Sequence, residues 1–431
     1  MAMVVKNNMS AITTLNTLNK NSSALSNSLK KVSSGMKING AADDASGYAI
    51  SERMRVQIRG LDQANSNTQN GNSMMKVAEG AVSSTVDILK TLKEKVINAA
   101  NDTNTDEDRA TIQKELDQSI DQINDNANVT FNGKYLVDGS HNQKVTATTT
   151  AMTNGSLNKD TDGSSAFSTL LDRNGNSLNI QDLDTITLSV VREGETHTFT
   201  CTGTQSISGL VTAASAYLST DIGTTSTIGS DVAKDTVSTA NGENAITIHA
   251  KGTGVTNQVS GITFSVTNTK GQVQKSANAV LDAFSETIRA QNTSDDRAIV
   301  LQVGTKANQS IKVGLTDMRA EALGLQAASG KTINIGTQEK ANAAINVLDN
   351  AVQKALDQQT TIGAVQSRLS YTSSNLTTAS ENVQASESTI RDADMAKEMT
   401  EYTKNNVLLQ AAQSMLAQAN QSSSSVLSLL Q

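Results

Sequence analysis

The chain has 431 residues, and 35 Lys and Arg against 42 Asp and Glu give it a formal net charge of −7. That length gives room for about two to four domains, and without a basic excess neither nucleic acid nor an anionic membrane is favoured as a partner. There is no proline, so nothing interrupts a helix by removing an amide donor. Five Tyr, five Phe and no Trp are too few aromatic residues to dominate one large globular core. We therefore expect long, thin elements packed through small aliphatic side chains.

The composition also excludes several kinds of site and segment. Cys201 is the single cysteine, which excludes an internal disulfide and a multi-cysteine metal centre. No run of roughly eighteen apolar residues exists to span a bilayer. The first ten residues become polar too early to supply the apolar middle of a secretory signal. If the chain leaves the cell, we expect a route that does not read such a signal.

A seven-residue recurrence of apolar side chains predicts a long helix near the N-terminus. It is broken once, at the polar Thr68. A turn at 102–106 and an apolar pattern over 112–127 then predict a shorter helix, so that this region forms a helical hairpin. The seam of the long helix comprises Met54, Leu61, Met75, Val82, Leu89 and Val96.

A second seam of the same period lies near the other end of the chain. It comprises Leu348, Ile362, Leu369, Leu376, Val383 and Ile390, with Ala341 and Ala355 at the remaining positions. Neither helix can bury such a stripe alone, and two stripes of matching period and similar length are natural partners. The two ends of the chain should therefore fold together.

Weaker heptad-like stripes occupy the two extremities. The N-terminal stripe comprises Ile12, Leu18, Leu25, Leu29, Val32 and Met36, and the C-terminal stripe comprises Met395, Met399, Tyr402, Leu409, Leu416, Leu427 and Leu430. Isolated helices of this kind are marginal in water, because ordering them costs more than a narrow apolar stripe returns. We expect both ends to be disordered in the monomer and to become ordered when neighbouring molecules cover them.

The middle of the chain changes character between about residues 141 and 275. Apolar residues alternate with Thr and Ser over 186–190 and 197–201, and the Glu193-Gly194 pair between them predicts a β-hairpin. Further strands are expected at 246–248 and 262–266. The predicted fold is mainly α, with long coiled-coil-like helices from both chain ends, an inserted β-rich domain, and a second small β element over 299–313.

Catalytic and metal-binding patterns are missing from the sequence. His141, His197 and His249 are far apart, and none has the spacing that places two ligands on one helix face. Cys201 alternates with Phe199 on the expected inner face of its strand, so a buried thiol is favoured over an exposed one that could cross-link chains. We expect no enzyme activity, no cofactor and no metal.

Four motifs at the two ends resemble those of bacterial flagellins. Residues 29–47 resemble the stretch "LSSGLRINSAKDDAAG", residues 131–139 resemble "FNGxxLLDG", and residues 388–399 resemble "SRIRDxDMAxE". The run 405–430 is similar to the C-terminus of that family, although Ser422–Ser425 stand where a proline is usual. The resemblance covers about 1–140 and 297–431 and leaves out the middle.

This resemblance implies three domains and an extracellular role. Residues 1–44 and 392–431 would form an inner terminal helical domain, and 45–140 with 276–391 would form a helical-bundle core with a small β element. Residues 141–275 would form a variable, surface-exposed β-rich domain. Flagellins polymerise into the helical filament that a rotary motor turns for swimming, so contacts between subunits would be heterologous and non-closing.

Several partners are implied by the resemblance alone. The first is the chain itself, in an open helical homopolymer. The others are the flagellar type III export apparatus, the filament cap, the hook-associated proteins and an export chaperone that would bind about 399–430. A host flagellin-sensing Toll-like receptor reads the long N-terminal helix of recognised flagellins. Here Thr91 replaces an Arg and Lys95 a Leu of that patch, while Glu115 matches its acidic position, so we expect weakened recognition.

Two other functions stay open on the sequence. A hook–filament junction protein shares the terminal motifs, and the strong C-terminal match favours the filament subunit over it. A non-flagellar surface adhesin would keep the seams and the β insertion but lack the four motifs. A metallopeptidase insertion would need His-Glu-x-x-His, and no histidine is followed by Glu.

Overall fold

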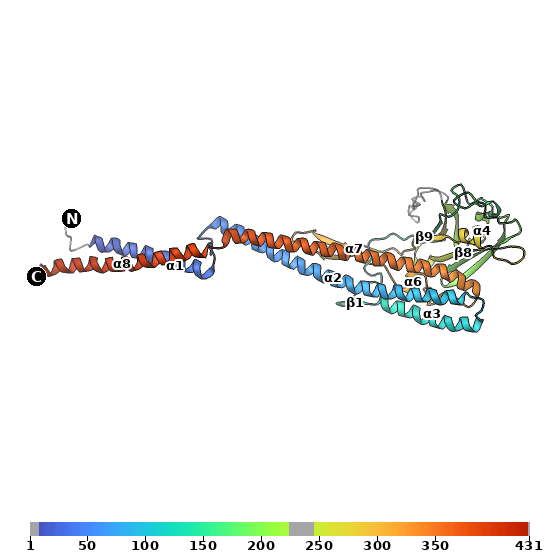
Figure 1. Cartoon of the computed structure of the whole chain (residues 1–431), viewed down its shortest axis with the longest axis horizontal. Coiled ribbons are helices and arrows are strands. Elements are labelled where there is room, and N and C mark those ends of the chain that lie inside the picture. The colour runs from blue at the N-terminus through green and yellow to red at the C-terminus, as the bar shows by residue number, and fades with distance from the viewer. Residues whose placement is uncertain (1–7, 224–244, 430–431) are drawn as a thin grey trace. The chain divides into compact units, whose positions relative to one another are not determined.

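A computed structural model describes residues 8–223 and 245–429 of the chain (Figure 1). Five long helices dominate the described part, as expected from the two apolar seams and the terminal stripes. They are α1 (Met9–Ser34), α2 (Ala45–Ala99), α3 (Asp106–Ala127), α7 (Gln338–Arg391) and α8 (Met395–Leu429). Three short helices lie between α3 and α7: α4 (Ile207–Ala213), α5 (Lys275–Leu281) and α6 (Ala320–Leu323). The prediction of a mainly helical fold with long terminal helices is confirmed.

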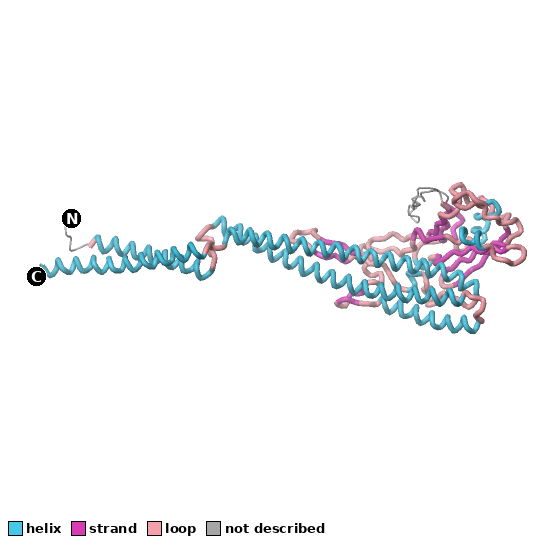
Figure 2. The backbone as a smooth tube through the Cα atoms, in the orientation of Figure 1, coloured by secondary structure: helices cyan, strands magenta, loops and turns pink. Residues whose placement is uncertain are grey.

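The β-rich middle region is also confirmed (Figure 2). One sheet has the strand order β6-β7-β3-β9 and another the order β5-β4-β8. Two-stranded pairs β1-β2 and β10-β11 stand apart from them. The strands are β1 (Thr130–Phe131), β2 (Lys134–Tyr135), β3 (Ala151–Asn154), β4 (Thr185–Arg192), β5 (Glu195–Thr202), β6 (Leu218–Gly223), β7 (Ile246–Ala250), β8 (Val259–Thr267), β9 (Phe284–Ile288), β10 (Ile299–Gln302) and β11 (Ser310–Val313).

The predicted hairpin forms as β4 and β5 in antiparallel register, from Thr185 opposite Thr202 to Arg192 opposite Glu195. Its two-residue turn has φ of 52° at Glu193 and 72° at Gly194. Positive φ at both positions matches the right-handed twist of the flanking strands. A side chain at the glycine would also meet the carbonyl oxygen of Thr332 at 2.7 Å, so this turn needs glycine for two reasons.

The turn between α2 and α3 is held by a cap and by one buried arginine. Thr105 accepts a hydrogen bond from the amide of Asp108, whose carboxylate accepts one from the Thr105 amide. This capping box satisfies two amide donors at the start of α3. The buried Arg109 side chain then donates to the carbonyl oxygens of Ala99 at 3.0 Å and Asn101 at 3.2 Å. Ala99 is the last residue of α2 and Asn101 lies in the turn that follows, so the arginine closes the predicted helical hairpin.

Contacts divide the chain into two compact units. The first comprises Met1–Thr68, Gln302–Gln309 and Tyr371–Gln431, and the second comprises Gln69–Leu301 and Ser310–Ser370. The boundary between the units therefore crosses α2 after Thr68 and α7 after Ser370. The three-domain division drawn from the sequence follows the helix ends instead and stays a prediction.

The β sheets of the second unit bury an apolar core and meet α7 through polar contacts. Gly261 on β8 lets the strand approach closely, since a Cβ there would lie 2.9 Å from Val347. Asn346 on α7 donates to the carbonyl oxygen of Ile262 at 3.2 Å and to a carboxylate oxygen of Asp282 at 3.0 Å. Helix α7 therefore presents its apolar seam and, beside it, a row of amide side chains.

Burial raises the pKa of Asp282 to about 6. Hydrogen bonds from the amide of Phe264 and the side chain of Asn346 lower this pKa, but burial has the larger effect. The folded state therefore holds this proton more tightly than the unfolded state, whose Asp has an ordinary value of 3.8. The resulting stabilisation is full below that value and is lost as pH rises through about 6.

We expect Asp282→Asn to remove this part of the pH dependence. When the pH rises from 4 to 7, the free energy of unfolding of the wild type should fall by about 2 kcal/mol relative to that of the variant. Urea unfolding followed by circular dichroism at several pH values measures the difference. The exposed Asp295→Asn is the control, and parallel curves for wild type and Asp282→Asn would contradict the assignment.

Candidate assembly interface

Helices α1 and α8 lie side by side and run in opposite directions (Figure 1). Four polar contacts join them along their length: Asn8 to the carbonyl oxygen of Ala419 at 3.2 Å, Asn21 to that of Leu408 at 3.1 Å, Asn405 to the Ser28 hydroxyl at 3.0 Å, and Lys31 to Glu398 at 3.7 Å. Asparagine amides that reach a facing backbone carbonyl fix the register of two helices that have few charges.

The fully buried side chains of this helix pair are small. Among the residues of α1 and α8 whose side chains are described, the buried ones are Ser28, Ala412 and Ala419. Small residues let two helix backbones approach closely, but they remove little apolar surface from water. The pair therefore gains little hydrophobic stabilisation from its own contact.

Large apolar side chains remain outside the pair. We define the terminal apolar surface as nine residues of α1 and α8 that are 42% to 64% exposed: Met9, Ile12, Leu15, Leu29, Met395, Met399, Val407, Leu408 and Met415. Single exposed apolar residues are ordinary, but nine on two paired helices are more than a monomer usually exposes in one region.

The predicted terminal stripes divide between the inside and the outside of the pair. Ile12, Leu29, Met395 and Met399 are exposed, whereas seven stripe residues are half-buried: Leu18, Leu25, Val32, Met36, Tyr402, Leu409 and Leu416. The side chain of Leu427 and the whole of Leu430 lie outside the described residues. The role of these stripes in polymerisation stays a prediction.

The sequence patterns missed part of the terminal apolar surface. Leu408 and Met415 are seven residues apart and share one side of α8, about 100° round the helix from the heptad stripe. Val407 lies a further turn of about 100° from that stripe. A search for one stripe of period seven passes over all three, although the Leu408 and Met415 pair repeats with the same period.

The predicted long-helix seams are buried over most of their length. Met75, Val82, Leu89, Val96, Leu348, Ile362 and Leu369 are completely buried, and Leu61 and Leu376 nearly so. Met54, Val383 and Ile390 are half-buried. In the first unit, Leu61, Ala64 and Leu376 form one small cluster with Ala379 and Val383 packed against it. The apolar contact between α2 and α7 in this unit is therefore sparse.

The motif at 29–47 contains the turn from α1 to α2. Gly35 ends α1 with a φ of 70°, the left-handed conformation that glycine adopts without strain. Asp43 accepts hydrogen bonds from the amides of Asn39 at 2.9 Å and Gly40 at 3.1 Å. The bond from Asn39 is the main cause that lowers the pKa of Asp43, which keeps the carboxylate ionised.

The second aspartate of that motif caps α2. Asp44 accepts hydrogen bonds from the amides of Ser46 and Gly47, both at 3.0 Å, and so satisfies donors at the helix start. A Cβ at Gly47 would lie 2.5 Å from the Asp44 carboxylate and 2.7 Å from the side chain of Ile38. Asp394 caps α8 in the same way through the amides of Ala396 and Lys397. These motif residues build turns.

The residues aligned with the receptor patch carry contacts within the chain. Lys95 forms an ion pair with Glu115 at 2.9 Å, with side chains 39% and 54% exposed. Thr91 donates to the carbonyl oxygen of Asp87 at 3.1 Å. The structure thus places Lys95 and Glu115 together, on α2 and α3.

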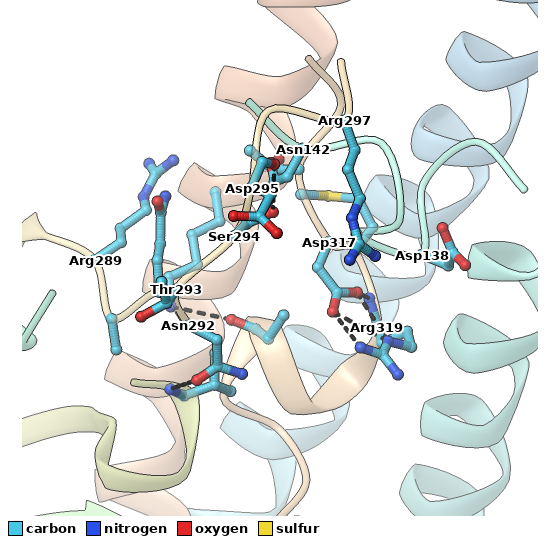
Figure 3. Close-up of a pocket in the computed structure, with 18 residues that line it drawn as sticks. Asp138, Asn142, Arg289, Asn292, Thr293, Ser294, Asp295, Arg297, Asp317 and Arg319 are labelled. Atoms are coloured by element: carbon cyan, nitrogen blue, oxygen red, sulfur yellow. Dashed lines mark hydrogen bonds and ion pairs between the residues drawn. The ribbon is translucent and has the colours of Figure 1, made fainter. Parts of the chain in front are cut away.

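A cavity of about 370 Å³ lies beside the motif at 131–139 (Figure 3). Gly139, with a φ of 81°, is close to Asp317 there, and Arg319 binds that carboxylate at 2.6 Å. Lys354 lines the cavity and is paired with the buried Glu286 at 3.2 Å. Because these cations are neutralised by acids of the same chain, the cavity identifies no ligand.

Other chemistry is limited in the part of the chain that the structure describes. No group of three or more His, Cys, Asp and Glu side chains there is arranged to hold a metal ion. None of the described helices combines the length and the apolar character needed to cross a membrane. Cys201 is half-buried against the β-rich core, and burial raises the pKa of its thiol to about 11.

Comparison with known proteins matches both ends of the chain to one family. The bacterial flagellin N-terminal helical region matches residues 5–142, and the bacterial flagellin C-terminal helical region matches residues 345–430. One similar solved structure is the flagellar hook associated protein-3 of Legionella pneumophila, 14% identical over 78% of this chain and 97% of that one. Its TM-score is 0.35, and a likeness this low says nothing about function.

Curated relatives match the chain over nearly its whole length. A flagellin of Clostridium tyrobutyricum is 36% identical over 97% of this chain and 99% of its own. A flagellin of Bacillus subtilis is 31% identical over 99% of this chain and 100% of its own. The flagellar filament 33 kDa core protein of Treponema phagedenis is 29% identical over 99% and 100%. The chain therefore belongs to the bacterial flagellins, the structural proteins that form the extracellular filament of the flagellum.

Proposed function

We propose that the terminal apolar surface is the polymerisation surface, and that neighbouring copies of the chain cover it in the filament. The observation that carries this proposal is the exposure of nine large apolar side chains on a helix pair whose only fully buried residues, among those described, are Ser and Ala. The contacts would join different surfaces of successive copies, which produces an open helical tube. The proposed role is structural and needs no catalytic residue.

The energetics favour order in the polymer over order in the free chain. Fixing the backbone of one residue costs about 1–2 kcal/mol, and α1 and α8 have 26 and 35 residues. Backbone hydrogen bonds and the few buried small side chains of the pair offset only part of that cost. Covering a Leu or Met completely returns about 1.5–3 kcal/mol. Neighbouring copies would supply this burial, so ordering of the ends and polymerisation occur together.

The same surface explains the other partners that we propose. Before export, an export chaperone would bind about 399–430, where Met399, Val407, Leu408 and Met415 are exposed on α8. The chain would then pass unfolded through the type III export apparatus. At the two ends of the filament, the cap and the hook-associated proteins would bind the same subunit surfaces that neighbouring copies bind along the filament. The proposed domains are 1–44 with 392–431, 45–140 with 276–391, and 141–275.

We also propose weakened recognition by the flagellin-sensing Toll-like receptor. Thr91 offers no cation at the position of the family's Arg, and Lys95 holds Glu115 in an ion pair. A binding partner that reads Glu115 would have to compete with this pair. Loss of an arginine anchor at an interface costs about 1 kcal/mol or more.

The first prediction concerns single residues of the polymerisation surface. We expect Leu408→Gln to leave thermal unfolding of the monomer unchanged, because this side chain is 42% exposed in the single chain. The critical concentration for elongation of filament seeds should rise about tenfold or more, since a buried Leu contact is lost. Leu183→Gln is the matched control, because this leucine is 75% exposed on the inserted region. Equal elongation by the two variants would contradict the proposal.

The second prediction concerns the whole terminal pair. A chain without residues 1–35 or without 395–431 should stay folded and soluble and fail to extend seeds, because the polymerisation surface is lost. In the intact chain, amides of α1 and α8 should exchange with solvent quickly in the dilute monomer and slowly in the filament. Hydrogen exchange followed by mass spectrometry measures both states. Filaments from either truncated chain, or protected ends in the monomer, would count against the proposal.

The third prediction concerns the receptor. A reporter-cell dose series should give low potency for this chain and a clear gain for the double variant Thr91→Arg, Lys95→Leu, which restores the two family residues of the patch. Lys159→Gln, which changes an exposed lysine of the inserted region, serves as control. Full potency of the unmodified chain would rule out weakened recognition.

A further inference from the structure

We infer that Arg391 positions the two terminal helices for pairing, by holding the C-terminal end of α1 and the N-terminal end of α8 at one point; these two ends are called the bases of the helices. The inference deepens the proposed polymerisation function and rests on it. Arg391 is the last residue of α7, and α8 begins four positions later at Met395. Its side chain is only 6% exposed. A buried cation is costly unless its donors are satisfied, so its partners indicate its role.

On one side, Arg391 binds the first turns of α2. Its guanidinium donates to the Glu52 carboxylate at 2.7 Å and to the Ser51 hydroxyl at 3.5 Å. The guanidinium carbon lies 5.5 Å from the centre of the Tyr48 ring, within the range of a cation–π contact. Tyr48, Ser51 and Glu52 are three and four positions apart and share one face of the helix. The end of α7 is thereby fixed to the beginning of α2.

On the other side, Arg391 holds the segment that follows α1. Its Nε donates to the sulfur of Met36 at 3.2 Å, and its carbonyl oxygen accepts a hydrogen bond from the amide of Lys37 at 2.7 Å. The Ala393 amide donates to the carbonyl oxygen of Gly35 at 2.9 Å. Two backbone bonds thus join the chain after α1 to the chain before α8, and the Arg391 side chain adds its contact with Met36 and ties this junction to α2.

These contacts change the cost of pairing α1 with α8. The two helices are separated by almost the whole chain, and closing a long loop costs entropy. With their bases fixed, pairing becomes a local event with a high effective concentration of one helix for the other. An arginine suits this position because its planar fork points donors in several directions at once, whereas a lysine offers a single point of charge. We therefore expect order in the terminal pair to begin at Arg391.

A second arginine on the same helices gives a matched control. Arg55 on α2 binds Glu387 on α7 at 3.1 Å, so it also joins α2 to α7. No contact of Arg55 with the segment after α1 is found among the described residues. Arg55 also lies 3.6 Å from the Glu52 carboxylate, with both side chains exposed to solvent. We expect its loss to weaken the α2–α7 contact but to leave every donor of Arg391 in place.

The experiment measures pairing directly by a disulfide. The Ser28 hydroxyl and the Asn405 amide nitrogen are 3.0 Å apart, so S28C/N405C in a C201S background places two thiols across the pair. Oxidised glutathione converts them to a disulfide and is itself reduced to two glutathione thiols. The rate for the monomer at fixed pH should fall about tenfold or more with R391Q, as expected for one lost charge-assisted contact. It should fall less with R391K and stay within about twofold with R55Q. Equal rates for R391Q and R55Q would overturn the inference.

A rescue separates positioning from general stability. R391Q should extend filament seeds poorly, and the oxidised S28C/N405C bond should restore its elongation, because the bond replaces the lost fixation of the pair. The oxidised S28C/N405C chain that keeps Arg391 is the control and should elongate normally. If it does so while oxidised R391Q does not, the inference is overturned. If R391Q does not fold, E52Q takes its place, since it removes the charged partner. A chain with Arg391 that extends no seeds at all would instead refute the proposed function, and the monomer disulfide rates would still decide the role of Arg391.

Discussion

The incomplete burial of the terminal helices is the constraint on which the architecture depends. Among their described side chains, helices α1 and α8 fully bury only Ser and Ala, leave most of the large apolar residues of their stripes half-buried, and are joined by asparagine side chains that reach facing carbonyls. Met9, Val407 and Met415 are exposed. Such a contact gives a defined register but little hydrophobic free energy. Neighbouring copies covering the terminal apolar surface, as proposed, would supply the burial that the pair lacks.

Burial of the long-helix seams differs between the two compact units. In the second unit, Met75, Leu89 and Ile362 are completely buried, and the inserted sheets meet α7 through Gly261 and Asn346. In the first unit, α2 and α7 share a small apolar cluster with polar and ionic contacts around it. Local opening is cheaper where few apolar contacts hold a segment. We expect the first unit to open at a lower free energy than the second.

Much of this fold follows from the period of the apolar residues. The heptads of α2 and α7 and the alternation in β4 and β5 are local patterns, and each corresponds to a helix or strand in the structure. Contacts between distant residues could not be predicted in this way. The pairing of Arg391 with Glu52, and of Asn346 with Asp282, joins polar residues far apart in sequence, and no periodicity marks them. Val407, Leu408 and Met415 of α8 were missed because they lie on other sides of the helix than the heptad stripe.

The motif residues and the apolar surface have separate tasks. Asp43, Asp44, Gly47 and Asp394 satisfy amides at helix ends and permit close backbone approach, and each of these tasks demands one particular side-chain geometry. Covering an apolar surface demands only side chains of suitable size. The residues at these turns should therefore tolerate substitution less than the apolar residues of α1 and α8, which need only remain hydrophobic and of suitable size.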